Sequence, residues 1–522
     1  MSRRLHRDRD KNYTETISRW SGRCVSFALC AYIWVMAVVY PLHLTDRGYT
    51  TIGRDKYEFF RGAALVLLLT VALPLAALGI CAIYKRWQGK AKIRIRLSGT
   101  DLAVAAFLLS ASLSTMLSPY RAIAWSGHEG WYIGLETLLL LLLAYVLVSC
   151  CWQYRDNVWL GFMAGAGIAF FLGICNRFYY YPLPFDVTNP AFISTLGNTN
   201  WVAGYFSVLW PVGAGLYVFA TGKVYRCIAG VYTFLAMCLG VVQGSDSAFL
   251  SFVAVFYLLA LLCMGRWKEY GGACLELLMA WCLAAQLMRL ARVLVPKTFE
   301  MYGLGEFLTT NSLTLWLLAP PAILYVLTKR GNARFLRLMD ARWAKRCVAL
   351  LPLLAVLALA VLSGMGALAF DNDFGSGRGL TWRMGMQMFA RMNPWQRLFG
   401  IGPDCFAEYL YSFPDLANLC YERFGDQLLK NAHNEILTML VNVGFVGAAA
   451  YLGIFATLFA RLLKSGATKP LLYVPALCVF SYLLHNMVSF TQILNLPFVI
   501  LIMAVGEANE RYVRICSHIP SK

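Results

Sequence analysis

Charged side chains are scarce in this sequence. Only 14% of its 522 residues are Asp, Glu, Lys or Arg, whereas 59% are hydrophobic and the mean hydropathy is +0.59. So little charge excludes a soluble globular protein, which needs a polar surface. Apolar runs of about twenty residues recur from end to end, which is the length that a helix needs to cross a bilayer. The composition therefore predicts a polytopic membrane protein with a single integral domain over residues 1–522.

Acidic residues are scarcer than basic ones, at 27 against 46, and the net charge is +19. The basic residues gather in short loops beside apolar runs, as orientation in a membrane requires, and no stacking module or basic face accompanies them. We therefore predict contact with membrane lipids and no binding of nucleic acid. Residues 85–96 carry six basic and no acidic side chains, and residues 329–346 carry seven basic side chains and one Asp. Both loops are predicted to be cytoplasmic, together with both termini.

Other absences narrow the chemistry. No small-residue cleavage site follows the first apolar run, so that run is read as a retained span. No Cys/His spacing typical of zinc occurs. Gly400-Ile401-Gly402 lacks the third glycine and the preceding strand of a dinucleotide site. Asp371-Asn372-Asp373 has the spacing of a metal-binding D-x-D motif, but at the end of a span it more often serves as a polar exit. We predict no metal and no cofactor.

The apolar runs predict an all-α bundle of about fourteen transmembrane helices, since only helices satisfy their own backbone in lipid at this length. With fourteen spans, every strongly basic loop lies on the same side of the membrane. The predicted spans cover residues 24–44, 63–84, 102–117, 133–151, 158–175, 201–220, 227–243, 248–264, 273–290, a tenth run ending near Thr328, 347–369, 435–463, 471–487 and 494–505.

One connection differs from the rest. Residues 370–434 stay out of an apolar run for about sixty residues, and a long insertion between short loops is usually functional. The alternation of basic loops places this segment on the extracytoplasmic face. Its six basic and seven acidic residues fit translocation. We interpret it as a lid that carries the chemistry, with a helix start predicted at Gly400-Ile401-Gly402-Pro403.

Arg378 and Arg383 are the candidate anion-binding residues of this loop. A guanidinium binds phosphate oxygens with two parallel hydrogen bonds and keeps its charge at any working pH. Arg378 also lies between glycines at a predicted helix start, where free N–H groups favour an anion. The alternatives are pairing with a nearby carboxylate or contact with lipid headgroups.

His433 is the single histidine of the loop and stands where the chain returns to the membrane. Its ordinary pKa suits a general base for a hydroxyl group. The alternative is an interfacial histidine, with Asn431 or Asn434 capping the next helix. Asp246 lies in a short turn between two spans, where a carboxylate suggests a cationic partner. The alternative for Asp246 is a solvated turn.

Two of the sixteen cysteines, Cys405 and Cys420, lie in the loop. On an oxidising face of the membrane they could form a disulfide. The alternative is that Cys405 packs beside Phe406 as a small hydrophobic residue.

Three stretches together resemble the O-antigen ligase and O-antigen polymerase family of polytopic glycosyltransferases. Leu196-Gly197-Asn198-Thr199-Asn200-Trp201 with Ala203-Gly204-Tyr205 resembles that family's LGNPNxxAGY motif. Arg378 and Trp382, followed by Asn393-Pro394 and Gly400-Ile401-Gly402 with Phe406, resemble its R-x-x-x-W … P-x-x-G-x-G-x-x-x-F loop. His433-Asn434 with Gly444 and Gly447 resembles its HN-x-x-L … G-x-x-G return. The resemblance covers residues 195–463.

The resemblance implies a GT-C-like helical fold in the bacterial cytoplasmic membrane. It implies transfer of a glycan from an undecaprenyl-diphosphate carrier to a hydroxyl of a glycan or glycolipid acceptor on the outer face. By resemblance, Arg378 holds the diphosphate and His433 assists the acceptor hydroxyl. Asn198, Asn200, Trp382 and Asn434 are supporting residues on the same ground.

One turn departs from the family, because Ser245-Asp246-Ser247 stands where Ser-Arg-Gly is usual. Arg383 could supply the missing cation, with Asp246 orienting an arginine. The resemblance does not separate a ligase from a polymerase. Two other classes stay open: a transporter or flippase for lipid-linked oligosaccharide, and a non-catalytic scaffold for envelope assembly.

Overall fold

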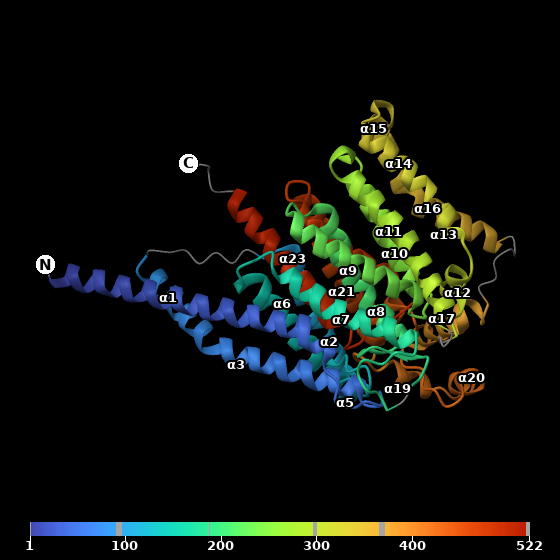
Figure 1. Ribbon diagram of the computed structural model, residues 1–522. Coiled ribbons are helices and arrows are strands. Elements are labelled where there is room, and N and C mark those ends of the chain that lie inside the picture. Colours follow the sequence, from blue (N-terminus) through green and yellow to red (C-terminus); the bar gives the residue numbers. More distant parts are fainter. Residues whose placement is uncertain (1, 90–96, 187, 296–299, 365–370, 518–522) are drawn as a thin grey trace.

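The computed structural model describes residues 2–89, 97–186, 188–295, 300–364 and 371–517. Within these ranges the chain is almost entirely helical, which confirms the all-α prediction (Figure 1). The sole strands there are β1 (Phe192–Ile193) and β2 (Gly197–Asn198), which form a short antiparallel hairpin. The basic run 90–96, the end of the eleventh predicted span and Phe370 lie outside the described residues.

The helices follow the apolar runs along the chain. The first half contains α1 (Ser2–Trp34), the π-helical turn η1 (Val35–Val39), α2 (Tyr40–Leu42), α3 (Ile52–Trp87), α4 (Gly99–Leu117), α5 (Arg121–Ser126), α6 (Leu135–Cys151), α7 (Val158–Arg177), α8 (Thr199–Phe219), α9 (Lys223–Val242), α10 (Ser247–Cys263) and α11 (Trp267–Leu294). The second half contains α12 (Gly303–Thr310), α13 (Leu313–Leu317), α14 (Ala319–Lys329), α15 (Ala333–Asp340), α16 (Arg342–Gly364), α17 (Phe374–Arg391), α18 (Pro394–Phe399), α19 (Phe406–Tyr411), α20 (Pro414–Phe424), α21 (Glu435–Gly466), the 3-10 turn η2 (Pro470–Leu472), α22 (Tyr473–His485) and α23 (Leu496–Ser517).

The predicted count of fourteen spans is not confirmed. Eight helices in the described part of the chain are long and apolar enough to cross a membrane, or nine if the bent pair 303–310 and 313–329 forms one span. Three further apolar helices, α6, α10 and η2–α22, have only 10–17 residues. The prediction counted each of these apolar runs as a full crossing, but helices of at most 17 residues lie at or below the lower end of the length that a spanning helix needs.

Helix α8 forms the centre of the bundle. Most of its residues from Val202 to Phe219 are buried, and it packs against α9, α10 and α22. Small residues allow these close approaches: a Cβ at Gly213 would lie 2.4 Å from the Tyr232 ring. Tight helix contacts through small residues are the common solution in membranes, where lipid offers no hydrophobic drive to associate. The centre therefore holds the ends of its helices in fixed positions.

The two ends of the bundle differ. Both termini and α15 lie toward one end, and α5, α12, α19 and α20 lie toward the other (Figure 1). The basic segment 329–346, which includes α15, is therefore at the end opposite the lid, as the charge pattern predicts. Which end faces the cytoplasm stays a prediction.

The predicted polar loop is a compact helical subdomain, which we call the lid (residues 371–434). It contains α17 to α20 and has a hydrophobic cluster of its own, separate from the core of the bundle. Buried lid residues of this cluster include Leu380, Met384, Met388, Ile401, Phe406, Leu410, Leu416 and Cys420. These apolar residues fall at the 3- and 4-residue spacing of a helix face, a pattern that the polar composition of the loop hides.

The lid is joined to α21 by backbone contacts. The Ile401 and Gly402 amides donate to the carbonyls of Val441 and Asn442, at 3.2 and 2.9 Å. A Cβ at Gly400 would lie 2.2 Å from the Asn442 carbonyl oxygen, so only glycine allows this approach. Helix α21 breaks here, at Gly444, whose φ is +69°. The predicted Gly-Pro helix start is therefore wrong: 400–402 is a pairing segment, and α19 begins at Phe406.

Candidate functional site

Arg378 is placed by a left-handed turn at the start of α17. Gly375, Ser376 and Gly377 have φ values of +59°, +62° and +92°, and the regular helix begins after them. Two of these positions are glycine, for which this conformation carries little penalty. The Arg378 guanidinium then reaches the connection after α22: its Nε donates to the Val488 carbonyl at 2.8 Å, and its Nη1 donates to the Gly375 carbonyl at 2.7 Å. A half-buried cation is thus held between two elements.

His433 stands at the return into the bundle in an uncommon backbone conformation, with φ +48°. The Asn431 side chain accepts a hydrogen bond from the His433 amide at 2.8 Å, and the Trp382 indole donates to the His433 carbonyl at 3.3 Å. The imidazole lies edge-on to Phe490, with ring centroids 5.0 Å apart. Left-handed conformations of non-glycine residues gather at functional sites, where the surroundings hold them in place.

The His433 imidazole is neutral at physiological pH. Burial and, second, the charge of Arg378 lower the pKa of His433 to about 4. Its Nδ1 atom is buried and has no hydrogen-bond partner in the described part of the chain. Burial also lowers the pKa of Arg378, and the carboxylate of Asp246 acts in the opposite direction. His433, Arg378 and Asp246 therefore form one electrostatic cluster.

Asp246 is held in the turn between α9 and α10. Its Oδ1 accepts a hydrogen bond from the Leu304 amide at 2.9 Å, at the start of α12. The neighbouring Ser245 hydroxyl donates to the Asn200 side chain at 2.8 Å and also contacts the Ser247 hydroxyl at 2.8 Å. The turn thus links α8, α10 and α12 beside the lid. No hydrogen bond or ion pair joins Asp246 to an arginine in the described part of the chain, so the predicted pairing stays a prediction, although the carboxylate of Asp246 acts to raise the pKa of Arg378.

His485 is a residue that the sequence analysis missed. It is fully buried at the end of α22, where its Nε2 lies 3.1 Å from the Ser247 hydroxyl and its Nδ1 lies 2.9 Å from the Asn486 side chain. The Asn486 carbonyl accepts a hydrogen bond from the Glu435 amide at 2.9 Å, two residues after His433. His485 therefore connects the Asp246 turn to the return segment. An ionisable residue inside an apolar run was the available signal.

Arg177 is a second residue missed for the same reason. It is buried at the end of α7, and its Nε and Nη1 donate to the carbonyls of Val242 and Pro190. A Cβ at Gly244 would lie 2.5 Å from the Arg177 Nη2 atom, so this cation lies directly beside the turn that carries Asp246. It gives the turn the cationic neighbour that Ser245-Asp246-Ser247 itself lacks.

The remaining predicted residues divide into two groups. Asn434 caps α21 through the Leu437 amide and donates to the Met487 carbonyl, and Asn198 caps α8 through the Asn200 amide. These are structural roles near the site. Arg383 is exposed and makes no ion pair or hydrogen bond in the described part of the chain. Five residues after Arg378 on one helix, it lies roughly 140° around the axis and does not share its position.

The predicted disulfide is not formed: Cys405 and Cys420 are both buried free thiols. The Cys405 thiol contacts the Pro403 carbonyl at 3.4 Å, while the Cys420 thiol lies 3.8 Å from the Met384 sulfur. Each thiol lies within the apolar cluster of the lid, which also contains Phe406. Cys405 therefore packs as a small hydrophobic residue, the alternative to the disulfide.

Asp371-Asn372-Asp373 forms a turn. Asp371 accepts hydrogen bonds from the Asp373 and Phe374 amides, both at 3.0 Å, and Asp373 pairs with Arg423 at 2.7 Å. No group of three potential metal-ligating side chains occurs among the residues that the structure describes. Asp371 thus stabilises the turn before α17, and Asp373 ties this turn to α20.

The arrangement supports charge stabilisation and proton acceptance at one point. A guanidinium with fixed direction stabilises negative charge on a leaving group, and a neutral imidazole accepts a proton from a hydroxyl. The groups come from α17, the return segment, the α9–α10 turn and the end of α22. Chain segments more than two hundred residues apart thus meet at the lid-facing end of the bundle.

A comparison with known protein families gives a match over part of the chain. Residues 301–452 match the family model described as O-antigen ligase. The matched stretch includes Arg378, Trp382 and His433, and it confirms the resemblance to the O-antigen ligase and polymerase family. Asp246 and His485 lie outside it. No curated protein matches the chain.

Proposed function

We propose that this protein, which carries the O-antigen ligase segment at residues 301–452, is a membrane glycosyltransferase of surface-polysaccharide synthesis. It moves a glycan from an undecaprenyl-diphosphate carrier to a hydroxyl of a glycan or glycolipid acceptor. The observation that carries the proposal is that Arg378 and His433 both contact the connection after α22: the Arg378 Nε donates to the Val488 carbonyl, and the His433 ring packs against Phe490, so an anion-binding group and a base lie near each other.

Arg378 binds the diphosphate of the donor. Cleavage of a glycosyl–diphosphate bond leaves negative charge on the phosphate oxygens, and a guanidinium stabilises that charge with directed hydrogen bonds. Arg378 is suited to this because the Val488 and Gly375 carbonyls hold it in one orientation. Asp246 offsets part of its charge before the donor arrives.

His433 accepts the proton of the attacking acceptor hydroxyl. In the free protein burial and, second, the charge of Arg378 lower the pKa of His433 and keep the imidazole neutral, which is the form that can accept a proton. When the diphosphate binds, its negative charge opposes that of Arg378, and the pKa of His433 rises. The base thus becomes stronger only when the donor is in place.

The test is the turnover of the His433→Ala variant with a purified lipid-diphosphate-linked glycan donor. Loss of a general base should lower turnover by roughly 10²–10⁴-fold, while donor binding is retained. His128→Ala is the matched control, because His128 lies at the lid border, 3.6 Å from Glu408, and outside the cluster. Asn431→Ala is unsuitable as a control, since Asn431 holds the His433 backbone. Near-normal turnover per folded molecule in His433→Ala would contradict the proposal.

A deletion strain separates the two forms of the activity. Lost attachment of an otherwise complete polysaccharide identifies a ligase, and shortened chains identify a polymerase. Complementation with the wild-type gene and with the His433→Ala variant ties either phenotype to this site.

A further inference from the structure

A second candidate site lies at the end of the bundle opposite the lid. It is a cavity of about 710 Å³ at the ends of α4, α6, α21 and α23. From His433 the chain runs through most of α21 to Arg461 on its wall, which is roughly 40 Å of helix. The cavity is therefore separate from the site of the proposed transfer reaction.

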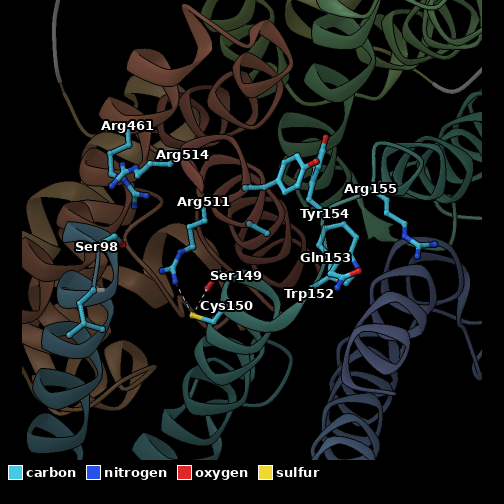
Figure 2. A pocket seen from close by; sticks show the side chains of 13 residues that line it. Ser98, Ser149, Cys150, Trp152, Gln153, Tyr154, Arg155, Arg461, Arg511 and Arg514 are labelled. Atoms are coloured by element: carbon cyan, nitrogen blue, oxygen red, sulfur yellow. Dashed lines mark hydrogen bonds between the residues drawn. The ribbon is translucent and has the colours of Figure 1, made fainter. Parts of the chain in front are cut away.

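Among the residues that the structure describes, four arginines and no acidic residue line this cavity. Arg461, Arg511 and Arg514 come from α21 and α23, and Arg155 comes from the loop after α6 and lies across from them (Figure 2). A cavity of this size is in the range of pockets that hold small molecules. Its lining alone selects an anion over a cation.

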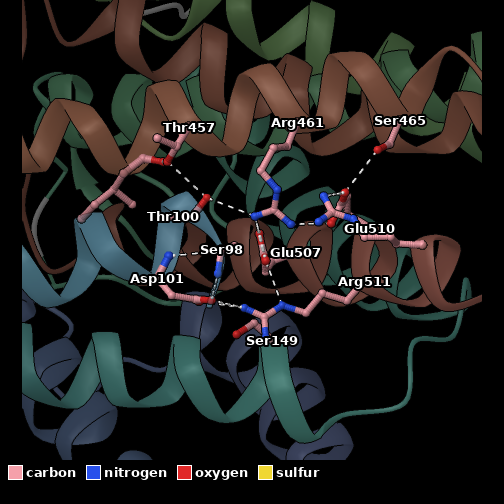
Figure 3. Close-up of polar contacts among 12 residues, drawn as sticks. Ser98, Thr100, Asp101, Ser149, Thr457, Arg461, Ser465, Glu507, Glu510 and Arg511 are labelled. Atoms are coloured by element: carbon pink, nitrogen blue, oxygen red, sulfur yellow. Dashed lines mark hydrogen bonds and ion pairs between the residues drawn. The ribbon is translucent and has the colours of Figure 1, made fainter. Parts of the chain in front are cut away.

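The acidic partners of three arginines lie outside the lining. Arg461 pairs with Glu507 and Glu510, Arg511 pairs with Asp101 and Glu507, and Arg514 pairs with Glu510 (Figure 3). The side chains of these three acids are at most 10% exposed. The carboxylates therefore orient the guanidinium groups from outside the cavity. The side chains that face the cavity are the arginines.

Some N–H groups of the arginines that line the cavity lack a strong hydrogen-bond acceptor. The Arg461 Nε atom is buried without a hydrogen-bond partner among the described residues. The Arg511 Nη1 atom contacts only the Cys150 sulfur, at 3.0 Å, and sulfur is a weak acceptor. Arg155 is exposed and has no ion pair in the part of the chain that the structure describes. Phosphate oxygens would satisfy these donors with charge-assisted bonds.

The rest of the lining combines the polar residues Ser98, Ser149 and Gln153 with apolar and aromatic residues that include Leu97, Trp152, Ala508 and Tyr512. Leu97 and Tyr512 are 62% and 50% exposed, so an apolar surface continues from the cavity to its margin. Aromatic side chains of this kind are enriched at the level of lipid headgroups, and basic pockets between membrane helices bind anionic headgroups. A free phosphate ion would leave this surface unused.

We propose that this cavity binds the phosphate headgroup of an anionic membrane phospholipid. The lipid phosphate contacts Arg155 and the arginines of α21 and α23, and the glycerol region contacts the apolar margin. The site joins four helix ends, so an occupied cavity stabilises the packing of α23 against α6 and α21.

The experiment is native mass spectrometry of the full-length protein in detergent, titrated with phosphatidylglycerol or phosphatidylcholine. The wild type should retain phosphatidylglycerol preferentially. Arg155→Gln/Arg514→Gln should weaken that binding roughly 30-fold, since each basic side chain near a lipid phosphate contributes about 1 kcal/mol. Arg155→Gln alone, which disturbs no ion pair, should weaken it roughly fivefold. Arg330→Gln/Arg334→Gln is the control, because both residues are exposed and basic outside the cavity.

Equal retention of the two lipids by the wild type would overturn the proposal. So would unchanged phosphatidylglycerol binding in the Arg155→Gln variant, or an equal loss in the control. A parallel titration with glycerol phosphate distinguishes the source: if the free compound displaces the lipid at matched concentration, the cavity is a site for soluble phosphates and the lipid assignment is wrong.

Discussion

Arg378 shows how much of this site depends on a single side chain. Its guanidinium uses two different nitrogens to bond the Val488 and Gly375 carbonyls, so its plane is fixed before any substrate arrives. A side chain with this geometry presents its remaining donors in one direction. Lysine carries the same charge but has no such fork.

We therefore expect Arg378→Lys to reduce turnover by at least about 100-fold, the scale on which a lost oxyanion contact acts. The assay uses purified protein and a lipid-diphosphate-linked donor. Arg383→Lys is the matched control on the same helix, because Arg383 is exposed and without a partner in the described residues. If Arg378→Lys turns over normally, or if both variants fail alike, Arg378 does not hold the diphosphate.

The pH dependence of the reaction provides a test of His433. Its pKa of about 4 in the free protein means that the base-competent neutral form persists as the pH falls from 7 to 5. The acid limb of kcat/KM, which reports the free enzyme, should therefore lie near pH 4, whereas the acid limb of kcat should lie higher. The second shift follows because bound diphosphate offsets the charge of Arg378.

Both profiles are measured between about pH 3 and pH 8 on the same preparation, with the folded fraction checked at each pH. An acid limb of kcat/KM near the ordinary histidine value would contradict the burial of His433. Coincident limbs for kcat and kcat/KM would contradict the effect of the diphosphate.

Local sequence predicted some of these residues and not others. The turn of glycines before Arg378 and the Asn434 cap were accessible, because backbone conformation and capping depend on neighbours in the chain. For His485 and Arg177 the sequence offered only the signal of an ionisable residue inside an apolar run, because their contacts, with Ser247 and with the Gly244 turn, join residues 238 and 67 positions apart. Cys405 and Cys420 were wrongly paired because sequence distance says nothing of which neighbours each thiol meets.

At the scale of elements, the lid is fastened to the bundle mainly by buried polar contacts. Asp404 has φ +60°, and one of its carboxylate oxygens accepts hydrogen bonds from the His128 and Ile133 amides, at 2.8 and 3.0 Å. The Ser118 hydroxyl donates to the Ile401 carbonyl nearby. The lid is thus anchored on the segment between α4 and α6.

Burial raises the pKa of Asp404 to about 7, against an ordinary value of 3.8. The folded state therefore holds this proton at pH values where the unfolded chain has lost it. The resulting stabilisation is complete below about pH 4 and is lost as the pH rises through about 7, with a size on the order of a few kcal/mol. Asp404→Asn removes this dependence, and its amide oxygen can still accept both hydrogen bonds.

The apparent melting temperature of the wild type relative to Asp404→Asn should therefore fall between pH 5 and pH 8. Asp415→Asn is the control: hydrogen bonding to Arg391 lowers the pKa of Asp415, so its stabilisation is lost only below this pH range, and the difference between this variant and the wild type should stay constant within it. A constant difference between the wild type and Asp404→Asn across this range would show that Asp404 is not buried as a neutral acid.

Elements were predicted better than the segments between them. Each apolar run that the structure describes is helical, since no other conformation satisfies the backbone in lipid. The predicted count of fourteen spans is not confirmed, because α6, α10 and η2–α22 are shorter than the eight helices of the described chain that are long enough to cross a membrane. For the lid, the sequence predicted helix starts only at Arg378 and at Gly400–Pro403. The extents of its helices were not predicted, because their apolar faces are separated by polar residues and stabilised by a cluster formed from distant segments.

At the scale of the whole molecule, the placement of the lid and of the basic segments at opposite ends predicts sidedness. We expect a cysteine introduced at Gln427 in the lid to react with an impermeant reagent in intact cells. A cysteine at Arg334 in α15 should react only after the membrane is opened. Both residues are exposed, so reagent access depends on the side of the membrane.

The background for this experiment replaces the exposed native cysteines Cys24, Cys150, Cys227 and Cys347 with serine. Labelling at Arg334→Cys in intact cells would contradict the topology. So would protection of Gln427→Cys in a protein that is shown to be folded by the turnover assay.

The anchoring of Arg378 by the Val488 carbonyl has a consequence for biosynthesis. Translation completes the lid well before it reaches residue 488, so the guanidinium has no fixed direction while the chain is still being made. The His433 ring likewise lacks its contact with Phe490 until that residue has been synthesised. A ribosome that stalls before the last two helices therefore leaves a chain in which neither Arg378 nor His433 is held in place. Under the proposed function, such a partly inserted chain would not cleave a lipid-linked donor.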